Sequence, residues 1–65
     1  MATIRDVLTR LRRDGWLVVR RRGSHRQLQH PLKPGTVTVA GHPRDSVRPG
    51  TYRAIMKQAR MKDTS

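Results

Sequence analysis

Apolar residues along this 65-residue chain change from helical to extended spacing and back to helical. A helix is predicted over residues 3–14 because apolar residues recur there on one face: Ile4, Val7, Leu8 and Leu11. Thr3 can cap this helix, with Asp6 completing a weaker form of the capping box, and Gly15 suits the left-handed position after its end. The N-terminal part of the chain therefore carries clear start and stop signals for one helix.

Extended segments occupy the middle of the chain. Residues 16–21 are rich in β-branched and large apolar side chains, which is typical of a mostly buried strand. A Gly-Ser pair at 23–24 supplies a turn, and residues 25–30 then alternate, with Leu28 as their strong apolar group. Alternation places His25 on the opposite side of that strand, so His25 is expected to face away from the core.

The C-terminal half is predicted to contain a third strand and a second helix. Residues 36–39 alternate, with two valines facing inward, and residues 40–50 have no period and are expected to form a loop. The second helix is predicted from Thr51, as its cap, to about Arg60. Its buried face consists of Tyr52, Ile55, Met56 and Ala59.

These elements give an α+β fold of order α-β-β-β-α, in which two helices cover one face of a three-stranded antiparallel sheet and leave the other face open. One domain over residues 1–65 is expected, because no linker or repeat divides the chain. The chain has no cysteine, which favours a cytoplasmic setting, and no apolar run long enough to span a membrane.

Positive charge is the strongest global signal for function. The chain has 15 lysines and arginines against four acidic residues, a formal net charge of +11. Such an excess predicts a polyanionic partner, and the predominance of arginine favours the phosphates of nucleic acid. A basic protein that is merely well solvated and a helix bound at a membrane surface are the alternatives, and the charge excess makes both less favoured.

His25 directly follows the Gly-Ser turn and is surrounded in sequence by Arg20, Arg21, Arg22 and Arg26. RNA carries its own nucleophile, the 2′-hydroxyl, so a small ribonuclease needs a base to take that proton and donors to hold the phosphate. His25 and the arginines can supply these groups. The alternative is a surface histidine at a hairpin tip with no catalytic role. The residues alone favour neither interpretation over the other.

Other candidate residues carry weaker signals. His25 and His30 lie five apart on one strand and point to opposite faces, so a shared zinc ion is not expected, and no other cofactor motif is present. His42 is a candidate second histidine of the site. A second basic stripe, which is either a solvated helix face or a phosphate-binding surface, consists of Arg53, Lys57 and Arg60.

Four segments follow one another along the chain: DGWLVVRRRGSHRQLQHP, GTVTV, the following HP, and PGTYRAIMKQA. Their order is a more specific sign of a protein family than any one of the segments. Together they resemble the HicA toxins of bacterial toxin-antitoxin systems, over nearly the whole chain. The resemblance implies a double-stranded-RNA-binding-like fold, which agrees with the element order above. It also implies a metal-independent endoribonuclease that cleaves mRNA, blocks translation and is held inactive by a HicB antitoxin.

The resemblance assigns the catalytic histidine to His25 and its turn to the preceding Gly-Ser pair, with Trp16 and Ile55 at structural positions. The chain departs from the family pattern at Arg26, where many relatives have a second histidine. It departs again at Arg60, where a glycine is usual and where arginine can extend the last helix. A non-catalytic RNA-binding module of the same fold is the alternative function, and it leaves the placement of His25 unexplained.

Overall fold

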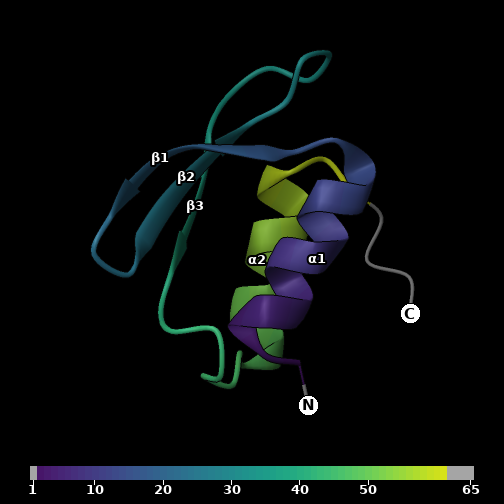
Figure 1. The fold of residues 1–65 in the computed structure, drawn as a ribbon. Coiled ribbons are helices and arrows are strands. Elements are labelled where there is room, and N and C mark those ends of the chain that lie inside the picture. Colours follow the sequence, from purple (N-terminus) through teal and green to yellow (C-terminus); the bar gives the residue numbers. More distant parts are fainter. Residues whose placement is uncertain (1, 62–65) are drawn as a thin grey trace.

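The computed structural model describes residues 2–61 and has the element order α-β-β-β-α (Figure 1). Its helices and strands are α1 (Ile4–Asp14), β1 (Leu17–Arg22), β2 (His25–Gln29), β3 (Val37–Ala40) and α2 (Pro49–Gln58). The three strands form one antiparallel sheet in the order β1-β2-β3. The predicted α+β arrangement is therefore confirmed.

Both helices pack on the same face of the sheet. Leu28 of β2 and Val37 and Val39 of β3 are fully buried on that face, whereas the alternate residues of these strands are exposed. The core also contains the apolar stripe of α1, Trp16, and the inner residues of α2. Because no element covers the other face of the sheet in the described part of the chain, that face is open to solvent (Figure 1).

The sequence signals at α1 are confirmed. Thr3 is the N-cap, and its hydroxyl and backbone form the reciprocal capping box with Asp6. At the other end Gly15 has φ 107°, and a Cβ at this position would lie 2.6 Å from Nε2 of His30. Glycine is required here both by the left-handed backbone and by the close approach of the imidazole.

His30 joins the end of α1 to the loop between β2 and β3. Its Nε2 lies 2.6 Å from the carbonyl oxygen of Asp14, and its Nδ1 accepts the backbone N–H groups of Leu32 and Lys33 at 2.9 and 3.2 Å. These partners place the proton on Nε2, which donates to Asp14. The ring also packs edge-on against the fully buried Trp16, with 5.4 Å between centroids. His30 therefore stabilises the fold at this corner.

β1 differs from its prediction. It begins at Leu17 and is exposed along nearly its whole length, with Val18 as the residue that packs against the core. β1 is an edge strand, and its hairpin with β2 extends away from the helices (Figure 1). Among the apolar residues of this segment, Trp16, which precedes the strand, is fully buried, whereas Leu17 and Val19 are exposed.

α2 also differs from its prediction at both ends. It begins at Pro49 with Arg48 as N-cap, so the expectation that Thr51 caps the helix was wrong. Proline suits the first helical position because its ring fixes φ and its missing N–H needs no partner there. The helix ends at Gln58, and Arg60 adopts φ 55° instead of extending it.

The loop before α2 packs against the N-terminus of α1. The N–H groups of Ile4 and Arg5 donate to the carbonyl oxygens of Asp45 and Pro43 at 2.9 and 3.0 Å, and Val47 is buried in the core. This loop thus satisfies two of the four N–H groups that a helix leaves without partners at its start.

Substitution by alanine should have opposite effects on stability at Gly15 and at Gly50. We expect Gly15→Ala to lower the free energy of unfolding by at least about 1 kcal/mol, because the left-handed backbone and His30 both oppose a Cβ. Gly50 lies in α2 with no neighbour near its Cβ position, so Gly50→Ala should raise stability by about 0.5 kcal/mol. Urea unfolding of the two variants measures both effects, and equal shifts would contradict this account.

The end of α2 predicts a stabilising substitution. Both helices end with the same hydrogen bonds: Arg60 N–H donates to Lys57 and Met61 N–H to Met56, as Gly15 and Trp16 do after α1. A left-handed backbone costs free energy for arginine but not for glycine, so Arg60→Gly should stabilise the protein by about 0.5–1 kcal/mol. Arg60→Ala removes the same charge but keeps the Cβ, and thermal unfolding of this control should show no comparable gain.

Candidate active site on the open sheet face

A β-bulge in β1 decides which arginines share a face with His25. Val18 pairs with Leu28 on the core side, but Arg20, two residues further, pairs with Gln27 on the open side. The register shifts between Val18 and Arg20, so Val19 is the extra residue of a bulge. Without this shift, Arg20 and Arg22 would share the core side with Val18, because side chains alternate along a strand.

The open face carries a shallow hollow of about 250 Å³ around His25. Its walls come from all three strands: Arg20, Arg22, His25, Gln27 and Thr38. Arg22 is the cross-strand partner of His25, and Gln27 is paired with Arg20 on one side and Thr38 on the other. The hollow therefore combines one exposed imidazole with two exposed guanidinium groups and two neutral polar side chains.

The lining of this hollow defines what it can do chemically. An imidazole is the side chain that most often accepts or donates a proton near neutral pH. Guanidinium groups offer paired N–H donors that match the oxygens of a phosphate. A phosphodiester bound by Arg20 and Arg22 would lie beside the ring of His25, and the open sheet face leaves room for a polymer to pass.

Arg21 and Arg26 lie on the other side of the sheet. They are cross-strand partners, and Arg26 also pairs with the buried Val39, which places both side chains on the face of the helices. Arg26 is only 7% exposed, and its Nη1 donates to the carbonyl oxygen of Gly41 at 3.0 Å. The expectation that Arg26 holds a phosphate beside His25 does not fit this position, because adjacent residues of a strand point to opposite faces.

The second basic stripe is separate from His25. Arg53 and Lys57 are exposed on α2, and Arg60 is exposed just after its end. The inner residues of α2 pack into the core on the covered face of the sheet. The sheet therefore lies between this stripe and the hollow around His25.

His42 is exposed in the loop after β3 and does not line the hollow around His25. That loop begins beside the hairpin turn, because the N–H of Gly41 donates to the carbonyl oxygen of Ser24 at 3.1 Å. Within residues 2–61, no three histidine or acidic side chains gather in a way that could hold a metal ion.

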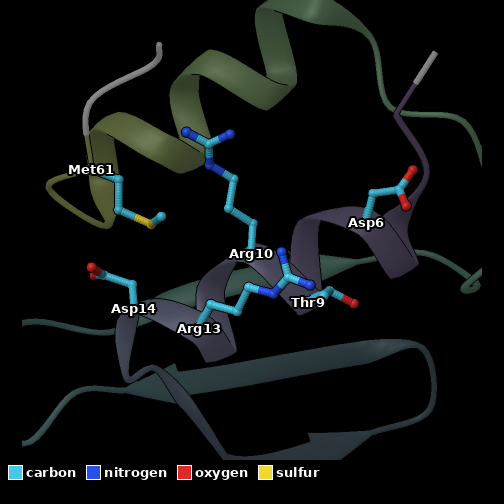
Figure 2. A pocket seen from close by; sticks show the side chains of 6 residues that line it. All are labelled: Asp6, Thr9, Arg10, Arg13, Asp14 and Met61. Atoms are coloured by element: carbon cyan, nitrogen blue, oxygen red, sulfur yellow. The ribbon is translucent and has the colours of Figure 1, made fainter. Parts of the chain in front are cut away.

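A larger hollow, of about 590 Å³, lies on the helix side of the molecule. Figure 2 shows Arg10 and Arg13 on α1 between Asp6 and Asp14, with Met61 nearby. Its carboxylates have structural partners: the backbone N–H of Thr3 donates to Asp6 and holds its pKa below the usual value, and Asp14 pairs with Lys33. This hollow offers no histidine, so the face with His25 is the stronger candidate for chemistry.

An α-β-β-β-α domain with an arginine-rich open sheet is typical of small proteins that bind nucleic acid. The family model described as HicA toxin of bacterial toxin-antitoxin matches residues 4–61, so the chain belongs to the HicA toxin family. Membership implies the toxin role in a toxin-antitoxin system and an antitoxin as partner. A comparison with curated protein sequences found no match. No helix in the described range is long and apolar enough to cross a membrane.

Sequence reasoning missed three members of this arrangement. Gln27 shares a face with His25 by alternation along β2 but was not assigned to the site, and Thr38 lines the hollow because the register pairs it with Gln27. A single strand's sequence does not determine its register. The bulge at Val19 had a signal that was overlooked: two adjacent valines followed by three arginines cannot all satisfy one alternation. A strand with Val18 inside and Arg20 outside requires an extra residue between them.

Proposed function

We propose that this protein is a toxin endoribonuclease that cleaves mRNA, with His25 as the general base. The observation that carries this proposal is the hollow on the open sheet face, where His25 lies with Arg20 and Arg22. Family membership supports the toxin role, and the net charge of +11 supports a polyanionic substrate. A cytoplasmic site of action follows from mRNA as substrate.

In the proposed reaction, the substrate supplies the nucleophile. A ring nitrogen of His25 takes the proton of an RNA 2′-hydroxyl while the 2′-oxygen bonds to the adjacent phosphorus. The bond from phosphorus to the 5′-oxygen breaks, and that oxygen takes a proton from water. Arg20 and Arg22 stabilise the charge that develops on the phosphoryl oxygens. The products are a cyclic phosphate and a 5′-hydroxyl, and no metal or cofactor enters these steps.

We further propose that the antitoxin, of HicB type, inhibits by covering the open sheet face. This face holds Arg20, Arg22 and His25 and also Leu17, which pairs with the exposed Gln29 and is itself 60% exposed. Cations beside an exposed apolar residue suit a protein partner with carboxylates and an apolar contact. Such a partner would exclude RNA from His25 without changing the toxin fold.

Substitution of His25 tests the catalytic proposal directly. We expect His25→Gln to reduce cleavage of purified RNA by roughly 100-fold to 10,000-fold in the presence of a chelator, because the proton acceptor is lost. The wild type should keep its activity in chelator, and growth arrest on induction should disappear with the variant. Cleavage is measured on gels from the products, and a 2′,3′-cyclic phosphate end identifies the nucleophile.

The matched control is His42→Gln, which replaces another exposed histidine outside the hollow. This variant should cut within a few-fold of the wild type. Equal cleavage by wild type and His25→Gln would refute the general-base role. If the folded wild type binds RNA without cutting it, the non-catalytic RNA-binding module is the correct function.

The two arginines of the hollow predict the salt dependence of RNA binding. Each phosphate contact to single-stranded RNA contributes about 0.7 to the slope of log affinity against log salt. Arg20→Gln combined with Arg22→Gln removes the one phosphate contact beside His25 and should therefore reduce that slope by about 0.7, measured with a 2′-O-methyl RNA that lacks the nucleophile. Arg53→Gln with Lys57→Gln, on the far side of the sheet, should leave the slope unchanged. If this second double variant lowered the slope and the first did not, the RNA would bind at α2 instead.

A further inference from the structure

A second basic hollow, of about 260 Å³, lies on the opposite side of the β1–β2 hairpin from His25. We call it the α1 hollow, because α1 contributes most of its lining. Four arginines form it together with three uncharged residues: Arg5 and Arg12 of α1, Arg21 of β1, Arg26 of β2, Leu8, Thr9 and Pro43. It shares no residue with the hollow around His25.

No carboxylate of the described chain forms an ion pair with these arginines. Of the three described acidic residues, Asp6 caps α1 and interacts electrostatically with the adjacent Arg5, Asp14 pairs with Lys33, and Asp45 accepts the backbone N–H of His42. Like charges held at one site repel each other, and the repulsion is relieved when a polyanion binds. The α1 hollow therefore has the electrostatics of an anion site.

Arg26 is the strongest evidence for a built site. The residue is only 7% exposed, and its Nη1 donates to two neutral backbone carbonyls, of Gly41 at 3.0 Å and Ser24 at 3.5 Å. A buried cation without a counter-ion is costly, and apolar side chains are the usual occupants of such positions. The two carbonyls hold the guanidinium at the base of the hollow, where it adds charge beneath the three exposed arginines.

We propose that the α1 hollow binds a backbone phosphodiester of the same RNA whose cleavage site lies at His25. This inference rests on the proposed function, because it takes RNA as the substrate. β1 is an edge strand with Arg20 and Arg22 on one side and Arg21 on the other. An RNA strand can therefore pass around this edge with guanidinium groups along its path.

The edge strand also explains why we favour RNA over an acidic protein. Phosphates repeat at every nucleotide, so one continuous chain can neutralise arginines on both sides of a thin hairpin. Thr9 adds a hydroxyl donor beside Arg5 and Arg12, and phosphate oxygens accept from both kinds of group. The second contact would orient the strand and fix which nucleotide lies beside His25.

The test compares two pairs of arginines on the same helix. Arg5→Gln with Arg12→Gln removes charge from the α1 hollow, whereas Arg10→Gln with Arg13→Gln removes the same charge from the larger hollow in Figure 2. Binding is measured with uncleavable 2′-O-methyl RNAs of about 4 and about 12 nucleotides. Circular dichroism and thermal unfolding establish that both double variants fold.

We expect the Arg5 and Arg12 variant to lower the salt slope for the longer RNA by about 0.7, the value for one phosphate contact, and to leave the slope for the shorter RNA unchanged. The Arg10 and Arg13 variant should change neither value. Equal salt slopes of RNA binding in the two double variants would overturn the inference. An unchanged salt slope together with weakened antitoxin binding would also overturn it, because the hollow would then bind an acidic protein. Competition by inorganic phosphate alone, with no dependence on RNA length, would also overturn it.

These outcomes separate the inference from the function on which it rests. Cleavage that depends on His25, together with an unchanged slope in the Arg5 and Arg12 variant, refutes only the second phosphate site. Failure of the wild type to bind either RNA refutes both. Loss of slope in a protein that does not cut RNA supports the α1 hollow and refutes the catalytic role of His25.

Discussion

Cross-strand pairing in the β1–β2 hairpin decides on which side of the sheet the candidate site residues of these two strands lie. Core packing requires Val18 and Leu28 to face the helices, and strand alternation alone would then send Arg20 and Arg22 inward as well. The bulge resets the alternation and brings Arg20 and Arg22 onto the face that carries His25. The bulge at Val19 is therefore the feature that allows a closed core and a basic open face to share one strand.

The corner at the other end of β1 holds that hairpin in place. Trp16 is fully buried directly before the strand, and His30 packs against it while contacting the end of α1 at Asp14. Gly15 permits this approach because it has no Cβ. The histidines at the two ends of β2 therefore differ in role. His30, just after the strand, forms hydrogen bonds through both ring nitrogens, whereas His25, at its start, is exposed on the open face.

Local signals were enough to predict most of the fold. The capping box at Thr3 and Asp6, the apolar stripe of α1 and the alternation around Leu28 each depend on residues close in sequence, and each was read correctly. The start of α2 was misplaced because Thr51 and Pro49 offer competing signals, and proline at the first position prevailed. The burial of Arg26 depends on Gly41, which is 15 residues away, so no local pattern could reveal it.

The distribution of charge follows from the small size of the domain. A chain of 65 residues has a thin core, and a net charge of +11 destabilises its compact state through self-repulsion. Spreading the arginines evenly would minimise that repulsion, yet six of the twelve arginines line the two hollows on either side of one hairpin. Repulsion between clustered arginines lowers the stability of the isolated protein. A bound polyanion relieves that repulsion, so the same cluster raises the affinity for it. The free toxin is thus expected to gain stability from its antitoxin and from the RNA substrate that we propose, and the hairpin is where both gains would arise.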